Sequence, residues 1–184
     1  MTPDGKRSIG LAACGLTVFA VIAGAFWYFT WRPVRYVDPA WKFSIRFAPE
    51  WAYTGEGDGA VARAMRTKPV ERGTIETGVI SVFAAPIENI PDALAYRTWY
   101  SGFQRKSLEG FALVQEGVRT TPAFEAPWTL FIHRVGPDKS RLQVWQAFFV
   151  KGKIGYIVTS TAKPFDFESF RAEFEEAVDS FRLE

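Results

Sequence analysis

The sequence has almost none of the residues that build disulfides and the common metal centres. Its 184 residues include one cysteine, Cys14, and one histidine, His133. A single cysteine forms no disulfide framework, and Cys14 lies in an apolar run, so the rest of the chain has no thiol chemistry. A single histidine without cysteine partners does not make a typical zinc site, because carboxylates would have to complete it.

An excess of charge of one sign is also lacking. There are 22 Lys and Arg residues and 20 Asp and Glu residues, which gives a net charge of +2, and no long block of like charge occurs. Nucleic acids are bound by clustered basic surfaces, which this even balance does not supply. We therefore expect no nucleic-acid partner.

Catalytic signatures are absent as well. A triad of His133 with a serine and an aspartate is formally possible, but the GxSxG elbow is missing. The GEGDG stretch at 55–59 lacks the lysine of a phosphate loop and the ligand spacing of a calcium loop, so it predicts a turn. We interpret His133 as a structural or surface residue, and we expect no enzyme, no cofactor and no bound metal.

What the sequence does have is an apolar run without charged residues at 8–31. A helix of this length is roughly 36 Å long, because each residue rises ~1.5 Å, and it spans a ~30 Å hydrocarbon core. Aromatic residues gather at its second end, as they do at membrane interfaces: Trp27, Tyr28, Trp31 and Tyr36. We predict a cytoplasmic tail at 1–7 and a transmembrane signal anchor at 8–31.

Two other fates of the apolar run stay open. The letters LAAC, ending at Cys14, resemble a lipobox, but only about six weakly apolar residues precede that cysteine where an h-region needs ~7–15. Cleavage after Ala25 would use a better h-region, yet the mature chain would then begin with FWYFTW. We favour a retained anchor, because these aromatic residues suit a membrane interface better than a free N-terminus.

Small residues spaced by four would let a second helix approach the anchor closely: Gly10, Cys14, Ala20 and Gly24. They predict packing against an integral membrane protein. Basic residues flank both ends of the run, so the charge bias that sets orientation is weak. A short tail before one apolar segment is typical of a signal anchor, so we expect a single-pass protein of a bacterial inner membrane with its C-terminal domain in the periplasm.

After a short linker at 32–40, the remaining residues 41–184 suffice for one domain. Alternating apolar residues in WKFSIRFA, from Trp41 onward, predict a half-buried strand. A helix is expected after Pro91, then a meander of four strands, then an amphipathic helix from about Asp166. This order predicts an α+β fold in which a mostly antiparallel sheet is sandwiched by two helices.

Three sets of side chains in this domain bear on function. The first helix has an aromatic face that we expect to pack on the sheet: Tyr96, Trp99, Tyr100 and Phe103. The last helix has an acidic run that we expect to face solvent, partly balanced by Arg171 and Arg182: Glu173, Glu175, Glu176 and Asp179. The tryptophans exceed what a small core holds, so an exposed one is a candidate binding anchor: Trp41, Trp51, Trp99, Trp128 and Trp145.

The opening FSIRFAPEW, the strand GYIVTSTA and the closing Ser-Phe resemble the PsbP/DcrB-like superfamily of small α-β-α domains. The resemblance spans roughly 41–181, and its marks are mostly structural residues: Pro49, Trp51, Tyr156, Thr161, Ala162, Ser180 and Phe181. It implies an extracytoplasmic, mostly non-enzymatic domain. The metal sites of photosynthetic members use histidine and acidic residues, and a single histidine does not match them, so no functional residues are carried over.

The leading hypothesis is therefore a non-enzymatic, membrane-anchored accessory or assembly subunit of a larger membrane protein complex. The alternative is a tethered periplasmic module that binds or carries a lipid, a peptide or a small molecule. A deep apolar pocket with unsatisfied polar groups would favour the carrier, whereas a filled core would favour the subunit.

If the anchor is retained, the intact mass of the protein extracted from membranes matches a chain that still contains residues 8–31. A mass that matches a chain starting at Phe26 would instead show cleavage. A mass that matches a chain starting at a lipid-modified Cys14 would show lipidation.

Overall fold

The computed structural model describes residues 32–71 and 73–184. The anchor predicted at 8–31, with its small-residue stripe and with Trp27, Tyr28 and Trp31, lies outside the described residues and stays a prediction. Within the described ranges, no helix is both long and apolar enough to span a bilayer. The residues from Val34 to Glu184 form one compact unit.

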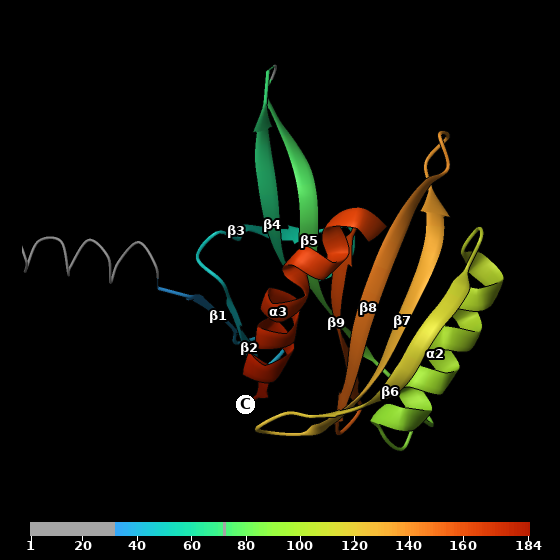
Figure 1. The fold of residues 1–184 in the computed structure, drawn as a ribbon. Coiled ribbons are helices and arrows are strands. Elements are labelled where there is room, and N and C mark those ends of the chain that lie inside the picture. The colour runs from blue at the N-terminus through green and yellow to red at the C-terminus, as the bar shows by residue number, and fades with distance from the viewer. Residues whose placement is uncertain (1–31, 72) are drawn as a thin grey trace, which may run out of the picture. The chain divides into compact units, whose positions relative to one another are not determined.

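A seven-stranded sheet is the centre of this unit (Figure 1). Its strand order is β3-β4-β5-β9-β8-β7-β6, and every neighbouring pair is antiparallel. The strands are β3 (Ala52–Gly57), β4 (Ala60–Val70), β5 (Gly73–Pro86), β6 (Ala112–Thr120), β7 (Glu125–Val135), β8 (Ser140–Lys151) and β9 (Ile154–Ala162). The meander expected for the last four strands is confirmed, and the turn expected at 55–59 joins β3 to β4.

A second, smaller sheet lies beside the first. It has the order β1-β2-β10 and consists of β1 (Val34–Asp38), β2 (Phe43–Phe47) and β10 (Arg182–Leu183). The range 32–40, expected to be a linker, therefore contains a strand, because the backbone of Val34–Asp38 pairs with β2. Only Arg32 and Pro33 separate this strand from the predicted anchor.

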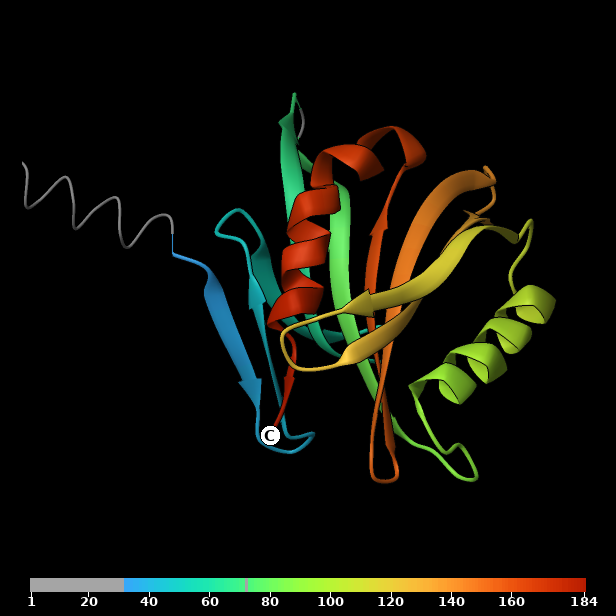
Figure 2. The same ribbon diagram turned by 60° about the horizontal axis from the view of Figure 1, so that its bottom comes forward.

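Two helices cover opposite faces of the large sheet, α2 (Ala93–Ser107) and α3 (Pro164–Ser180) (Figure 2). The alternation along β8 shows this most simply. Phe149 and Ala147 belong to the core under α3, whereas Phe148 belongs to a smaller core under α2 with Ile157 of β9. Since both faces are covered, the strand is a nearly unbroken buried run, and the predicted α+β arrangement of antiparallel strands and two helices is confirmed.

The core under α3 is mainly aromatic. Helix α3 contributes Phe167, Phe170 and Phe174, and β2 contributes three side chains that are fully buried: Phe43, Ile45 and Phe47. Phe181, directly after α3, packs on the rings of Phe43 and Phe149. Truncation of one such ring typically costs about 3–5 kcal/mol, so these contacts contribute much of the free energy that holds α3 on the sheet.

A close approach of backbone and ring fixes α2 in place. A Cβ atom at Gly155 of β9 would lie 2.6 Å from Cε1 and 2.7 Å from Cζ of Tyr96 in α2. Only glycine leaves room for the ring there. Tyr96 then reaches Phe148 edge-on, at 5.8 Å between ring centroids.

We expect Gly155→Ala to destabilise the fold by about 1–3 kcal/mol, because the new methyl group overpacks the Tyr96 contact. Gly102→Ala is the matched control. Gly102 lies in α2 with open space around its Cβ position, and alanine there should stabilise by about 0.5–1 kcal/mol. Urea unfolding measures both, and equal effects of the two alanines would contradict the packing argument.

Candidate functional site

The structure resolves which tryptophan is exposed. Trp51 and Trp145 are buried and Trp41 and Trp128 are partly buried, but 58% of the surface of Trp99 is accessible to solvent. Trp99 is therefore the candidate binding anchor that the sequence could not single out. It lies in the middle of α2, on the side of the domain opposite α3.

The aromatic face of α2 divides into a buried and an exposed half. Tyr96 and Tyr100 pack on Phe148 of β8, as expected. The expectation is wrong for Trp99 and Phe103, each of which is 58% exposed. Four residues at this spacing cover an arc of the helix that is wider than its contact with the sheet, so the outer pair stays outside.

Each ring of the exposed pair contacts a ring of the other pair, of which Tyr96 is buried and Tyr100 is partly buried. The ring of Trp99 stacks on that of Tyr96 at 6.1 Å, and Phe103 lies 6.3 Å from Tyr100. Burial raises the pKa of Tyr96 to about 12 and also raises the pKa of Tyr100, so both phenols stay neutral at physiological pH. The result is an ordered aromatic ledge, which we define as Trp99 and Phe103 on their base of Tyr96 and Tyr100.

Local sequence explains why the helix carrying this ledge begins where it does. Pro91 precedes the N-cap residue Asp92, whose carboxylate accepts a hydrogen bond from the backbone N–H of Ala95 at 2.8 Å. Such a cap satisfies one of the free donors of the first turn and stabilises the helix by about 1 kcal/mol. Basic residues Arg105 and Lys106 occupy the last turn, where they suit the helix dipole.

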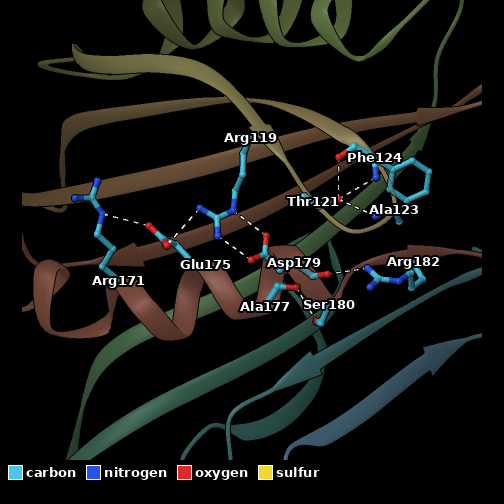
Figure 3. A network of polar contacts seen from close by, with 10 residues as sticks. All are labelled: Arg119, Thr121, Ala123, Phe124, Arg171, Glu175, Ala177, Asp179, Ser180 and Arg182. Carbon is cyan, nitrogen blue, oxygen red and sulfur yellow. Dashed lines mark hydrogen bonds and ion pairs between the residues drawn. The ribbon is translucent and has the colours of Figure 1, made fainter.

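A second candidate is a small cleft of about 170 Å³ between α3 and β6. Its aromatic lining comes from Trp128, Trp145 and Phe167, and its charged lining from Arg119, Arg171 and Glu175. Arg119 donates two hydrogen bonds to Asp179 at 2.8 and 2.7 Å (Figure 3). Chiefly through these bonds, Asp179 raises the pKa of the guanidinium, so the pair closes one end of the cleft as a fixed ion pair.

The acidic run of α3 is mostly bonded rather than solvated, so that expectation is wrong for Glu173 and Asp179, while the expected balance by Arg171 is found at Glu175. Glu173 accepts hydrogen bonds from Trp51 Nε1 and from Arg66 of β4. We call these three residues the Glu173 cluster. Glu175 pairs with Arg119 and Arg171, and Asp179 with Arg119. Only Glu176 is exposed as predicted. Arg66 and Arg119 come from distant strands, which no local pattern reveals, whereas Arg171 lies on α3 itself.

His133 lies on β7 beside Phe131, at 5.8 Å between ring centroids. Burial lowers its pKa, which favours the neutral imidazole. Among the described residues, no group of three or more His, Cys, Asp and Glu side chains is placed to hold a metal ion. The histidine thus has the surroundings of a packed structural side chain.

Tyr36, predicted at the membrane interface, is part of the small sheet. Its ring stacks on Tyr53 at 4.7 Å, and its hydroxyl donates to Asp38 at 3.1 Å. Burial is the first cause of a raised pKa for this phenol. The interface role of Tyr36 stays a prediction.

Neither a family model nor a curated protein matches the sequence, but solved structures match the fold. A solution structure of PsbP (CyanoP) from Synechocystis sp. PCC 6803 has a TM-score of 0.57 at 12% identity, over 83% of this chain and 92% of that one. The chain has a PsbP-like fold. The family marks agree with structural roles in that fold, since Tyr156 donates to the Trp41 carbonyl and Ser180 accepts from the Arg46 amide.

Other proteins with different roles share the PsbP-like fold. LpqN, involved in cell envelope biogenesis of Mycobacterium tuberculosis, has a TM-score of 0.61 at 15% identity, over 83% of this chain and 89% of its own. The Ran-binding protein Mog1p of Saccharomyces cerevisiae has a TM-score of 0.55 at 9% identity, over 83% and 96%. At such identities the match establishes the fold alone, and function has to be argued from this chain's own surface.

We expect the lowered pKa of His133 to make stability depend on pH. The unfolded chain binds the proton more readily, with a pKa of about 6.5, so stability rises with pH through this value and falls as pH drops through the folded pKa. Chemical unfolding at pH 5 and pH 8 should therefore show a smaller difference for His133→Gln than for the unchanged chain. An identical difference in both proteins would contradict the burial of the imidazole.

Proposed function

We propose that this chain is a non-enzymatic accessory or assembly subunit of a membrane protein complex. Residues 8–31 hold it in a bacterial inner membrane, and its PsbP-like domain lies on the periplasmic side. The observation that carries the proposal is the aromatic ledge on α2. Trp99 and Phe103 are exposed aromatic side chains one turn apart on α2, and each packs on a tyrosine ring, as suits an interface anchor.

The interior of the domain supports a binding subunit over a carrier. Aromatic side chains fill the space on both sides of the large sheet. A hollow of about 630 Å³ at the loop before α2 has the volume of usual ligand sites, ~300–1,000 Å³. It is formed by the surface segments Ile87–Pro91 and the β8–β9 turn, so it is an open hollow and not the deep apolar pocket expected of a carrier. The fold of LpqN supports an envelope-related placement, because that protein is involved in cell envelope biogenesis.

The second candidate is a periplasmic module that binds or carries a ligand. The cleft lined by Trp128 and Trp145 favours it, since two indoles lie beside charged groups. Its volume of about 170 Å³ is below the ~300–1,000 Å³ of usual ligand sites. The cleft therefore suits a single apolar side chain of a peptide better than a whole lipid.

To test the subunit proposal, the full chain and the double variant Trp99→Ser, Phe103→Ser are extracted from membranes in mild detergent and analysed by native mass spectrometry. We expect the unchanged chain to be found in a larger assembly. Loss of a hot-spot residue costs at least ~2 kcal/mol, so the variant should bind its partner at least roughly 30-fold more weakly.

Leu94→Ser is the matched control, because Leu94 is an exposed apolar residue of α2 outside the ledge. It should leave the assembly intact. Recovery of the unchanged chain solely as a monomer would overturn the proposal. Loss of the assembly in a Trp128→Ala variant, with the ledge variant unaffected, would transfer the binding role to the cleft.

A further inference from the structure

One end of the domain displays apolar side chains at the tips of separate segments. Phe165, in the first turn of α3, is 95% exposed, and Val70 and Ile75 of the β4–β5 hairpin are 43% and 49% exposed. The start of α3, the β4–β5 tip and the β7–β8 tip all lie at this end in both ribbon views (Figures 1 and 2). None of the three side chains belongs to a core cluster.

Basic side chains lie close to the start of α3. Arg134 of β7 lies directly opposite Arg141 of β8, although like charges in such pairs repel. Neither guanidinium has an ion-pair partner among the described residues. The pairing of Gln143 with Ala162 brings Lys163 next to this arginine pair, two residues before Phe165.

The balance of charge at this end favours an anionic partner. Further cations are Lys68 of β4 and Arg105 and Lys106 at the end of α2, while Lys139 pairs with Glu109. The opposing carboxylates are Glu71, Asp138 and Asp166, while Glu76 pairs with Arg63 and Glu168 pairs with Arg171. Cations are therefore in excess around Phe165, although the whole chain is close to neutral.

The length of the tether restricts what can cover this end. Strand β1 begins at Val34, so only Arg32 and Pro33 follow the predicted anchor. Two residues reach about 7 Å, which keeps the domain against the bilayer surface. In Figure 2, strand β1 runs toward the end of the domain that lies opposite the β4–β5 tip.

We propose that this end of the domain docks on an anionic phospholipid surface, with Phe165 inserted at the headgroup level and the surrounding cations facing lipid phosphates. An exposed apolar side chain beside an excess of cations suits a planar, deformable surface. The inference rests on the proposed membrane anchoring and adds a second, electrostatic contact to it.

Hydrogen exchange of the full chain tests the docking. The chain is reconstituted in nanodiscs of phosphatidylcholine alone or with phosphatidylglycerol, and exchange is followed at 68–76, 134–141 and 163–168. We expect slower exchange in the anionic discs at these segments only. A juxtamembrane cation contributes roughly 1 kcal/mol of attraction, so the docking equilibrium should weaken about fivefold for each one removed.

Two variants separate the apolar and the charged contributions. Phe165→Ser should abolish the protection in both kinds of disc, and the triple variant Arg134→Gln, Arg141→Gln, Lys163→Gln should abolish its dependence on phosphatidylglycerol. Leu94→Ser and Lys153→Gln are the controls, because the start of α2 and the β8–β9 turn lie at the opposite end of the domain, and they should leave protection unchanged. All of these side chains are exposed or intermediate, so folding is retained.

The outcomes distinguish docking from anchoring. Stable incorporation in discs without lipid-dependent protection would overturn the docking and leave the anchor intact. Release of the chain from the discs would show that anchoring fails. In that case, docking is supported only if the free chain still binds anionic discs and Phe165→Ser abolishes this binding. Protection that is the same in neutral and anionic discs but disappears when a partner protein is removed would assign this end to a protein surface.

Discussion

The packing of α3 on the large sheet is the constraint on which the rest of the structure depends. Phe174 and its neighbours bury the apolar side of the helix, and the Glu173 cluster fixes its polar side. Trp51 reaches Glu173 only because residue 78 is glycine, since a Cβ there would lie 2.9 Å from the indole. One carboxylate thereby joins the start of β3, strand β4 and α3.

The two surfaces proposed for binding are positioned by this packing and by the packing of α2 on the other face of the sheet. The start of α3 holds Phe165 beside the β7–β8 tip, and the same helix forms one wall of the Trp128–Trp145 cleft. On the other face, Gly155 lets Tyr96 settle on the sheet, and this contact turns Trp99 outward. Two buried helices thus present two different exposed surfaces, an aromatic ledge and a basic, apolar-tipped end.

A consistent physical picture connects the two proposals. A domain held within a few residues of a bilayer loses little further freedom when one end touches lipid, so modest attraction is sufficient there. Docking by the Phe165 end would orient the domain on the membrane surface. An oriented aromatic ledge could then meet a membrane-embedded partner at a fixed height, which lowers the entropic cost of association.

The sequence by itself determined the apolar run, the α+β order of elements, the PsbP-like fold and the stripes that form the core, because these depend on periodicity and turn residues that are local. It did not determine that Val34–Asp38 is a strand, since pairing with β2 requires a partner that periodicity does not report. Nor did it show that Trp99 is exposed while Tyr96 is buried, or that Glu173 is bonded while Glu176 faces solvent. Those differences depend on the angle at which each helix meets the sheet and on arginines from remote strands, which only the tertiary structure brings into contact.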